Sequence, residues 1–294
     1  MSGGQRASRP RIGSREWWTR WGRWLTQTRA FARRHLRQYA RSPVSLLFIV
    51  AWPAFWYLLI VHLLFVTGGQ TVEAVATAKA AFAVSFGLFG VFTVALTGVI
   101  STFTADIATK RYRKFRSLPL SPAADLAGRF TAGLGLSIGS YVALLTIGYV
   151  DGAAFTLRHA WSPTVVLLGV VAFAAIGVVI AIALAAIVPR PEYATTGATA
   201  VLLASFFGTG FNGVSPGLFP GPPWLLNVVP VSLITRLQLH HVVAPAGPAS
   251  APFEPPVLPA GPPAVGMVAL YALAAFSFGV LVIDWGVYRG EAGE

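Results

Sequence analysis

The sequence predicts an all-α, polytopic integral membrane protein with six transmembrane helices preceded by an amphipathic interfacial helix. The chain has 294 residues, of which 55% are hydrophobic and only 11% are charged. Six stretches contain no Asp, Glu, Lys or Arg, and each can cross a hydrocarbon core, which takes roughly 20 apolar residues. Such segments cross as helices because an unpaired backbone amide in lipid costs several kcal/mol. The predicted spans are Val44–Val66, Ala80–Phe103, Phe130–Val150, Thr164–Val188, Ala194–Phe211 and Ala264–Ile283.

The 22 Lys and Arg residues are divided unevenly between the two sides that six spans define. Eleven precede the first span, six lie between the second and third, and Arg190 and Arg289 share that side. The other side receives only Lys79, Arg158 and Arg236. Basic loops stay in the cytoplasm, so both termini are predicted to be cytoplasmic. Ala, Gly, Val and Arg are abundant, which suggests the plasma membrane of a prokaryote.

The net charge of +12 follows from this orientation, and the basic side is expected to meet anionic lipid headgroups. No nucleic-acid partner is expected, although binding of a polyanion by the N-terminal arm is the weaker alternative. Residues 1–14 are rich in Gly, Ser and Arg, which predicts a disordered cytoplasmic tail. Residues 289–294 form the second cytoplasmic tail, and residues 43–288 are assigned to the transmembrane domain.

Residues 15–42 are predicted to form the interfacial helix. Its Trp and other apolar side chains share one arc and its Arg side chains the other, which is typical of a helix that lies in the membrane interface. His35 falls within the apolar arc, and we interpret it as a histidine at headgroup depth rather than as a ligand. The helix should end at Ser42-Pro43, because a residue before proline avoids helical geometry.

Two further segments stand out. The second span carries a line of hydroxyl side chains at Thr93, Thr97, Ser101 and Thr104, which is either a helix-packing face or a wall of a translocation path. Residues 212–263 hold 13 of the 21 prolines. Within them, Trp224–Val243 is apolar but interrupted, so it predicts a re-entrant or interfacial segment on the outer side. The Pro-rich insert 244–263 is unexplained.

The loop between the second and third spans, residues 106–129, is the most specific feature. From Ile107 to Leu118 it has helical periodicity, and Pro119 ends the predicted helix. Ser121-Pro122 then provides an N-cap and a first-turn proline for the next helix. A short cationic helix of this kind suits docking into a groove of a soluble partner. Its residues are Ile107, Arg111, Tyr112, Arg113, Lys114, Phe115, Arg116 and Leu118, with Phe115 expected as the buried anchor.

Catalytic and cofactor motifs are absent from the sequence. There is no phosphate-binding G-x-x-x-x-G-K-[ST], no H-E-x-x-H and no Cys, so we expect no catalytic residue, no bound metal and no cofactor. The predicted spans contain no Asp, Glu, Lys or Arg, the charged residues that usually couple transport to an ion gradient. Energy for any transport must therefore come from another protein.

Three segments together resemble the membrane subunit of a type-two ATP-binding-cassette exporter, the ABC-2 permease family. The loop reads Arg-Lys-Phe-Arg-Ser-Leu-Pro-Leu-Ser-Pro from Arg113, followed by the pair Gly128-Arg129. The outer segment runs from Asn212 through Pro223-Trp224 to Pro230. The interfacial helix matches the connecting helix of the family, and the agreement extends from Arg15 to Tyr288.

The resemblance implies a permease that forms a homo- or heterodimer and pairs with separate ATPase subunits, which would bind the ATP. It also implies export of a lipidic, amphiphilic or drug-like substrate. Members often carry a Glu ahead of the Leu-Pro turn. Here Lys110–Lys114 contains no acid, which implies a more acidic groove on the ATPase. The alternatives are a non-transporting membrane scaffold or assembly subunit and, less favoured, a membrane-embedded enzyme.

Overall fold

The computed structural model describes residues 14–41, 43–65, 70–188, 190–209, 217, 219–243 and 257–288. These residues form helices connected by short segments, and the one pairing of extended backbone described is an isolated antiparallel bridge between Phe155 and Val243. The predicted all-α fold of a multi-pass membrane protein is confirmed. Residues 1–13 and 289–294 of the predicted tails, Asn212 and most of the Pro-rich insert lie outside the described residues, whereas Ser14 begins α1.

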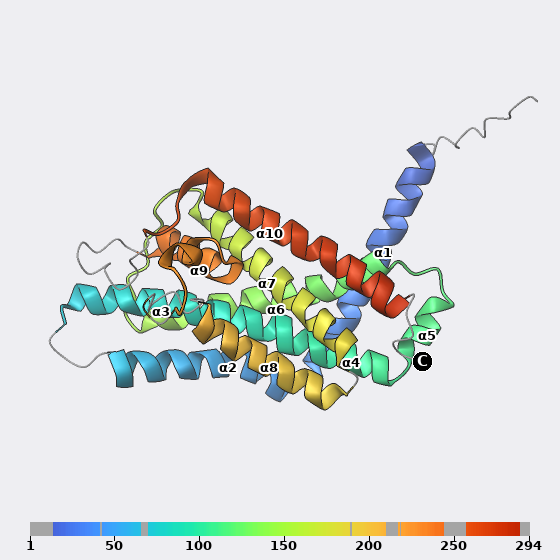
Figure 1. Ribbon diagram of the computed structural model, residues 1–294, viewed down its shortest axis with the longest axis horizontal. Coiled ribbons are helices and arrows are strands. Elements are labelled where there is room, and N and C mark those ends of the chain that lie inside the picture. The colour runs from blue at the N-terminus through green and yellow to red at the C-terminus, as the bar shows by residue number, and fades with distance from the viewer. Residues whose placement is uncertain are drawn as a thin grey trace, which may run out of the picture.

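Helices follow one another along the whole described chain (Figure 1). Three of them run directly into a wider π-helical segment, labelled η. In order they are α1 (Ser14–Ala40), α2 (Pro43–Leu59) with η1 (Ile60–Phe65), α3 (Val72–Thr93) with η2 (Val94–Gly98) and α4 (Val99–Ala108), α5 (Arg111–Arg116), α6 (Pro122–Val150), α7 (Ser162–Ile187), α8 (Pro191–Gly208), the 3₁₀-helix η4 (Pro223–Asn227), α9 (Pro230–Val242) and α10 (Gly261–Val282) with η6 (Ile283–Tyr288).

Five described helices are long and apolar enough to cross a membrane, so the predicted number of six is not confirmed. They are Leu46–Leu64, Val72–Ala108, Pro122–Val150, Ser162–Ile187 and Gly261–Trp285. The helix α8 takes the place of the predicted fifth span but is not among them. Its 18 residues include Glu192 in the first turn and several threonines, which lower its hydropathy.

Two membrane helices extend well beyond the predicted spans. The continuous helix from α3 to α4 has 37 residues, which corresponds to about 55 Å at 1.5 Å per residue, against a hydrocarbon core of about 30 Å. It ends at Ala108 rather than at Phe103, and α6 begins at Pro122 rather than at Phe130. The added turns contain Asp and Arg residues, whose burial is described below.

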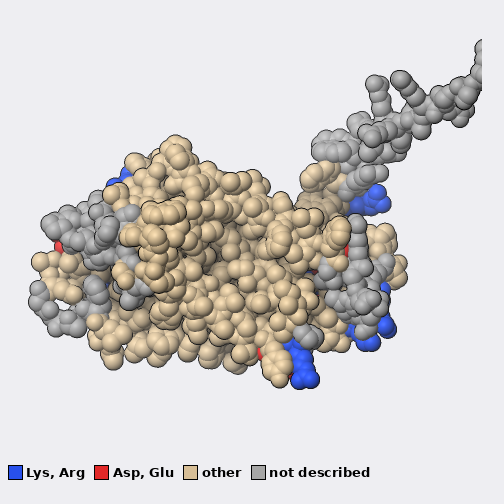
Figure 2. Space-filling model, viewed as in Figure 1, with Lys and Arg blue, Asp and Glu red and all other residues tan. Residues whose placement is uncertain are grey.

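The long helices lie side by side, and α7 packs against α3, α4, α9 and α10. Figure 1 shows α5 at one end of this bundle and α9 at the other, while α1 projects from the α5 end steeply to the bundle axis. An interfacial helix has this orientation, because the bundle axis crosses the membrane. In Figure 2 the visible face of the bundle is almost free of charge, and the Lys and Arg atoms in view lie near its ends and edges.

The short helix α9 begins with Pro230 in its first turn. It is buried at the end of the bundle opposite α5. Gln238 accepts a hydrogen bond from the Tyr141 hydroxyl at 2.6 Å and donates one to the carbonyl of Val166 at 3.2 Å. Gly169 of α7 permits this approach, since a Cβ there would lie 2.6 Å from the Gln238 amide nitrogen. Within the segment predicted as re-entrant, α9 is therefore packed into the bundle, whereas Trp224 at the start of the segment is exposed.

Candidate functional site

The loop predicted as one amphipathic helix is divided in two. The helix α4 ends at Ala108 and contains Ile107, and Lys110 then adopts a left-handed conformation with φ 54°. The following helix, α5, contains only six residues. The prediction of a continuous helix from Ile107 to Leu118 is wrong, because a left-handed residue breaks the hydrogen-bond pattern of an α-helix.

Tyr112 and Phe115 face into the protein rather than toward a partner. Tyr112 is fully buried. The half-buried Phe115 ring lies edge-on to Phe31 of α1, with ring centroids 5.7 Å apart, and the Arg34 guanidinium lies 5.6 Å from its centroid. The side chain predicted as a partner anchor is thus already packed inside the chain. Between Arg111 and Leu118 the exposed residues are Arg111, Arg113, Lys114, Ser117 and Leu118, while the side chain of Arg116 lies outside the described ones.

A buried ionic network, which we call the Asp106 cluster, holds this segment to the bundle. Arg129 lies at its centre and is 2% exposed. It donates to Asp106 at 2.7 Å and to Asp125 at 3.1 Å, and its guanidinium lies 4.9 Å from the Phe103 ring centroid. The Tyr112 hydroxyl donates to Asp125 at 3.0 Å. The complete cluster is Arg34, Asp106, Arg111, Tyr112, Asp125 and Arg129.

The cluster joins four helices, because Arg34 belongs to α1, Asp106 to α4, Arg111 to α5 and Arg129 to α6. Both Arg34 and Arg111 donate to the same oxygen of Asp106, Oδ1. A buried charge is tolerated only when it is paired and hydrogen-bonded. The sequence singled out Arg129 only as part of a family motif, and Asp125 lies four residues before it. Their spacing of four residues on one helix, which allows an ion pair, was the signal that could have revealed the cluster.

Gly128 lets α1 reach the cluster. A Cβ at this position would overlap the Phe31 Cβ and would lie 3.0 Å from both the Ala32 nitrogen and the Thr28 oxygen of α1. Two of these atoms belong to the backbone, so no side-chain rotation could relieve the contact. The Gly128-Arg129 pair thus combines a close helix crossing with the ionic anchor beside it.

His35 is buried beside the Asp106 cluster. Burial lowers its pKa to about 3, and the neighbouring charge of Arg129 contributes to the shift. The imidazole is therefore neutral, so its 4.0 Å separation from Asp125 is not an ion pair. Its Nδ1 atom lies 2.9 Å from the Gln38 side-chain oxygen. The sequence-based interpretation of a headgroup-depth histidine does not describe this packed side chain.

The neutral state of His35 predicts a pH-dependent stability. Between its folded pKa and the unfolded value of 6.5, the unfolded chain binds more protons, so stability falls as the pH is lowered through this window. Between pH 7 and pH 5 the contribution is about 2 kcal/mol. Thermal melts in detergent should show a smaller decrease for His35→Gln than for the wild type. Equal decreases in the two proteins would contradict a neutral buried imidazole.

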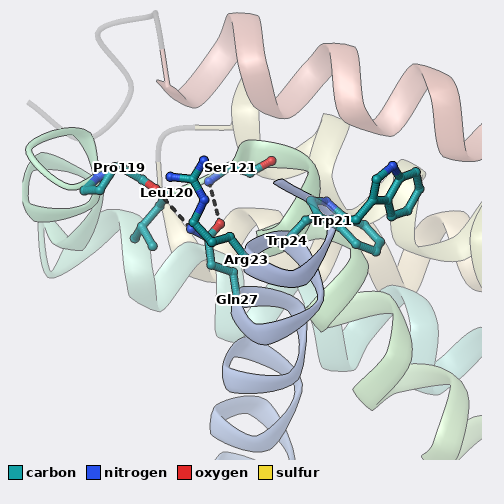
Figure 3. Close-up of a pocket in the computed structure, with 7 residues that line it drawn as sticks. All are labelled: Trp21, Arg23, Trp24, Gln27, Pro119, Leu120 and Ser121. Atoms are coloured by element: carbon teal, nitrogen blue, oxygen red, sulfur yellow. Dashed lines mark hydrogen bonds between the residues drawn. The ribbon is translucent and has the colours of Figure 1, made fainter. Parts of the chain in front are cut away.

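A second contact fixes the end of the loop to α1 (Figure 3). The Gln27 side chain donates to the Pro119 carbonyl at 3.0 Å and accepts from the Ser121 backbone amide at 3.0 Å. These contacts lie beside a cavity of about 660 Å³, into which Trp21 and Trp24 also face. No sequence pattern indicated this role for Gln27, because the role depends on how α1 packs beside the loop.

A groove with a volume of about 750 Å³ lies between α2 and α8. The helix α2 packs against α3, and α8 packs against α4 and η2, so the α3–η2–α4 helix forms the floor. Thr93, Thr97 and Ser101 line the groove, and Thr195 and Thr199 of α8 contribute further hydroxyl groups. Thr104 is buried instead and donates to the Ile100 carbonyl at 2.8 Å. Three of the four hydroxyl residues in the predicted line therefore share one cavity.

A second polar cluster, around Asp151, lies at the α9 end of the bundle and was not predicted from the sequence. Asp151, directly after α6, accepts hydrogen bonds from the Tyr57 hydroxyl and the Lys79 ammonium group, and His62 lies 2.9 Å from it. Burial alone would raise the pKa of Asp151, but the hydrogen bonds from Tyr57 and Lys79 outweigh it and lower the pKa. The ionised carboxylate links α2, α3 and α6.

Comparison with known proteins bears on the whole arrangement. The family model described as ABC-2 type transporter matches residues 26–238, which is more than half of the chain. The match includes the Asp106 cluster, the loop and the groove. No match to a curated protein was found.

Proposed function

Because the chain belongs to the ABC-2 type transporter family, we propose that this permease is driven by a separate ATPase subunit and exports an amphiphilic or drug-like substrate. The observation that carries the proposal is the Asp106 cluster, which fastens the loop to three membrane-associated helices. A force applied to α5 would reach α1, α4 and α6 through charged hydrogen bonds, which are stronger than neutral ones. ATP would bind to the ATPase and not to this chain.

Two other parts of the proposal have separate support. The division of Lys and Arg between the two sides supports cytoplasmic termini and a cytoplasmic position of α5, where an ATPase would be. The groove beside α2 and α8 is suited to be part of the translocation path, because it is lined by hydroxyl groups and aromatic rings. Closure of this groove by a second permease chain would produce the dimer that the resemblance implies.

The exposed residues of the loop define the surface that we assign to the ATPase. Leu118 is 47% exposed, and Arg113 and Lys114 of the preceding helix α5 are exposed as well. An apolar side chain at the centre of a contact contributes more than a solvated charge at its rim. Leu118, rather than Phe115, is therefore the expected anchor, and acidic residues on the ATPase would surround it.

We expect Leu118→Asp to reduce co-purification of a co-expressed ATPase by at least about tenfold, because a charge replaces an apolar side chain that the ATPase would bury. Arg113→Ala should reduce it by less than about fivefold. Substrate-stimulated ATP hydrolysis should follow the same order. Val72→Asp is the matched control, since Val72 is 87% exposed at the opposite end of the α3–η2–α4 helix. If Leu118→Asp retains the ATPase as Val72→Asp does, the docking surface is elsewhere or the chain is a scaffold.

A further inference from the structure

The α2 wall of the groove presents aromatic rings. Phe48 and Trp52 are stacked at 6.2 Å with an interplanar angle of 24°, and Phe55 continues the stack at 6.1 Å and 19°. All three side chains are exposed, and the first two line the groove. Exposed aromatic rings attract another ring, either edge-to-face or in an offset stack.

The α3–η2–α4 floor and the α8 wall present four hydroxyl groups whose protons are already used. Thr93 donates to the Phe89 carbonyl at 2.8 Å, and Thr97 donates to the Thr93 carbonyl at 2.6 Å. Ser101 donates to Gly98 at 2.9 Å, and Thr199 of α8 donates to Thr195 at 3.2 Å. A hydroxyl group has one proton to donate but two lone pairs that accept. Toward the groove these four oxygens can therefore only accept hydrogen bonds.

At the α1 end of the groove, the Tyr39 hydroxyl group is already engaged and does not offer a strong hydrogen-bond donor to a ligand. Tyr39 lines this end, and its side chain is hydrogen-bonded to Thr102. Thr102 donates in turn to the Val99 carbonyl at 3.0 Å. Gly98 is needed here, since a Cβ would lie 2.9 Å from the Tyr39 hydroxyl oxygen. Gln38 is the side chain of this end that retains an amide donor.

Charge is missing from the lining. Among the described residues that form the groove there is no Asp, Glu, Lys, Arg or His. A charged group that left water for this environment would lose its hydration without gaining a counter-ion, which is costly. A neutral molecule meets no such penalty. A neutral molecule that only accepts hydrogen bonds would, however, leave its own acceptors and those of the wall unpaired.

From these walls we infer that the groove binds uncharged ring compounds that carry hydrogen-bond donors along one edge. The ring would pack against Phe48 and Trp52, and its O–H or N–H groups would donate to Thr93, Thr97 and Ser101. The inference rests on the proposed function, because it names the substrate class of the same groove. It excludes organic cations and fully alkylated analogues as preferred ligands.

Two matched ligands test the donor requirement on the permease alone, in nanodiscs and without ATPase or nucleotide. Resveratrol is flat and neutral at pH 7 with three phenolic donors, and its trimethyl ether keeps the oxygens but loses every donor. Titration calorimetry should show resveratrol binding at least about tenfold more tightly, because unpaired acceptors are costly. The cationic dye ethidium should bind more weakly than resveratrol. Equal or tighter binding of the ether or of ethidium would overturn the inference.

Variants of Trp52 and Thr97 test whether the ligand contacts both the aromatic wall and the hydroxyl-lined floor of the groove. Trp52→Ala should weaken resveratrol binding by about tenfold, and Trp52→Phe should restore most of it. Thr97→Val, which keeps the shape of the side chain, should weaken resveratrol binding about threefold or more and leave the ether unaffected. Phe278→Ala on α10 is the control, since Phe278 is 54% exposed and is not part of the groove. Circular dichroism checks that each variant is folded.

The outcomes separate this inference from the proposed function. Loss of resveratrol binding in Phe278→Ala as large as in Trp52→Ala would mean that the ligand partitions into lipid or binds elsewhere. If the ligands bind in the predicted order but Leu118→Asp still co-purifies with the ATPase, the inferred ligand class of the groove stands and the assigned coupling surface is wrong. If Leu118→Asp loses the ATPase but the ligands do not bind in the predicted order, the coupling surface stands and the requirement for hydrogen-bond donors is wrong.

Discussion

Arg129→Met should destabilise the protein by about 3–5 kcal/mol, because it leaves two buried carboxylates without their shared partner. Asp106 would retain Arg34 and Arg111, but Asp125 would keep only the Tyr112 hydroxyl of its cluster partners. The thermal unfolding midpoint in detergent should therefore fall sharply, and resistance of the loop to proteolysis should fall with it.

Two comparisons make this result specific to charge. Arg33→Met removes an exposed arginine from α1 and should change the midpoint little. The triple variant Arg129→Met, Asp106→Asn, Asp125→Asn removes the buried carboxylates as well and should recover much of the loss, since neutral amides need no counter-ion. A triple variant no more stable than Arg129→Met would show that packing of the arginine, and not its charge, stabilises the site.

Gly128→Ala should separate α1 from α6. The added methyl group would lie well inside contact distance of two backbone atoms of α1, so the helices must move apart, at a cost of about 1–3 kcal/mol or more. We expect a lower unfolding midpoint and, with it, a loss of ATPase co-purification, since the displaced α1 carries Arg34 and Gln27.

Gly135→Ala on the same helix is the matched control. No heavy atom lies within 4 Å of a Cβ built there, and alanine favours a helix by up to about 1 kcal/mol over glycine. This variant should be neutral or slightly stabilising. Equal loss of stability in both variants would contradict the assignment of Gly128 to the helix crossing and would point to a general effect of glycine replacement in α6.

The sequence predicted the helices well because membrane spans are recognisable by the absence of charge. It misplaced their ends for the same reason. Asp106, Asp125 and Arg129 looked like residues at the membrane boundary, whereas mutual neutralisation lets α4 and α6 continue through them as buried helices. The absence of α8 from the five candidate spans has a related cause, since its threonines lower the hydropathy of a helix that still packs on α4.

The candidate site was harder to predict, because periodicity gives the face of a helix but not its neighbour. Tyr112 and Phe115 form an apolar face, as expected, yet α1 covers it and leaves Leu118 exposed. The left-handed Lys110 has no sequence signal comparable to a glycine. The hydroxyl line of Thr93, Thr97 and Ser101 was visible, but the aromatic wall opposite could be recognised only once α2 and α8 were placed.

The wide turn η2 has a mechanical consequence for the α3–η2–α4 helix. A π-helical turn contains one residue more than an α-helical turn of the same ladder. If Val94–Gly98 returned to α-helical bonding, α4 would rotate by about 100° and shift by about 1.5 Å relative to α3. Ser101 in the groove and Asp106 in the ionic cluster both lie beyond this turn. A one-residue change of register would therefore rotate and shift both sites together, because the same rigid helix carries them.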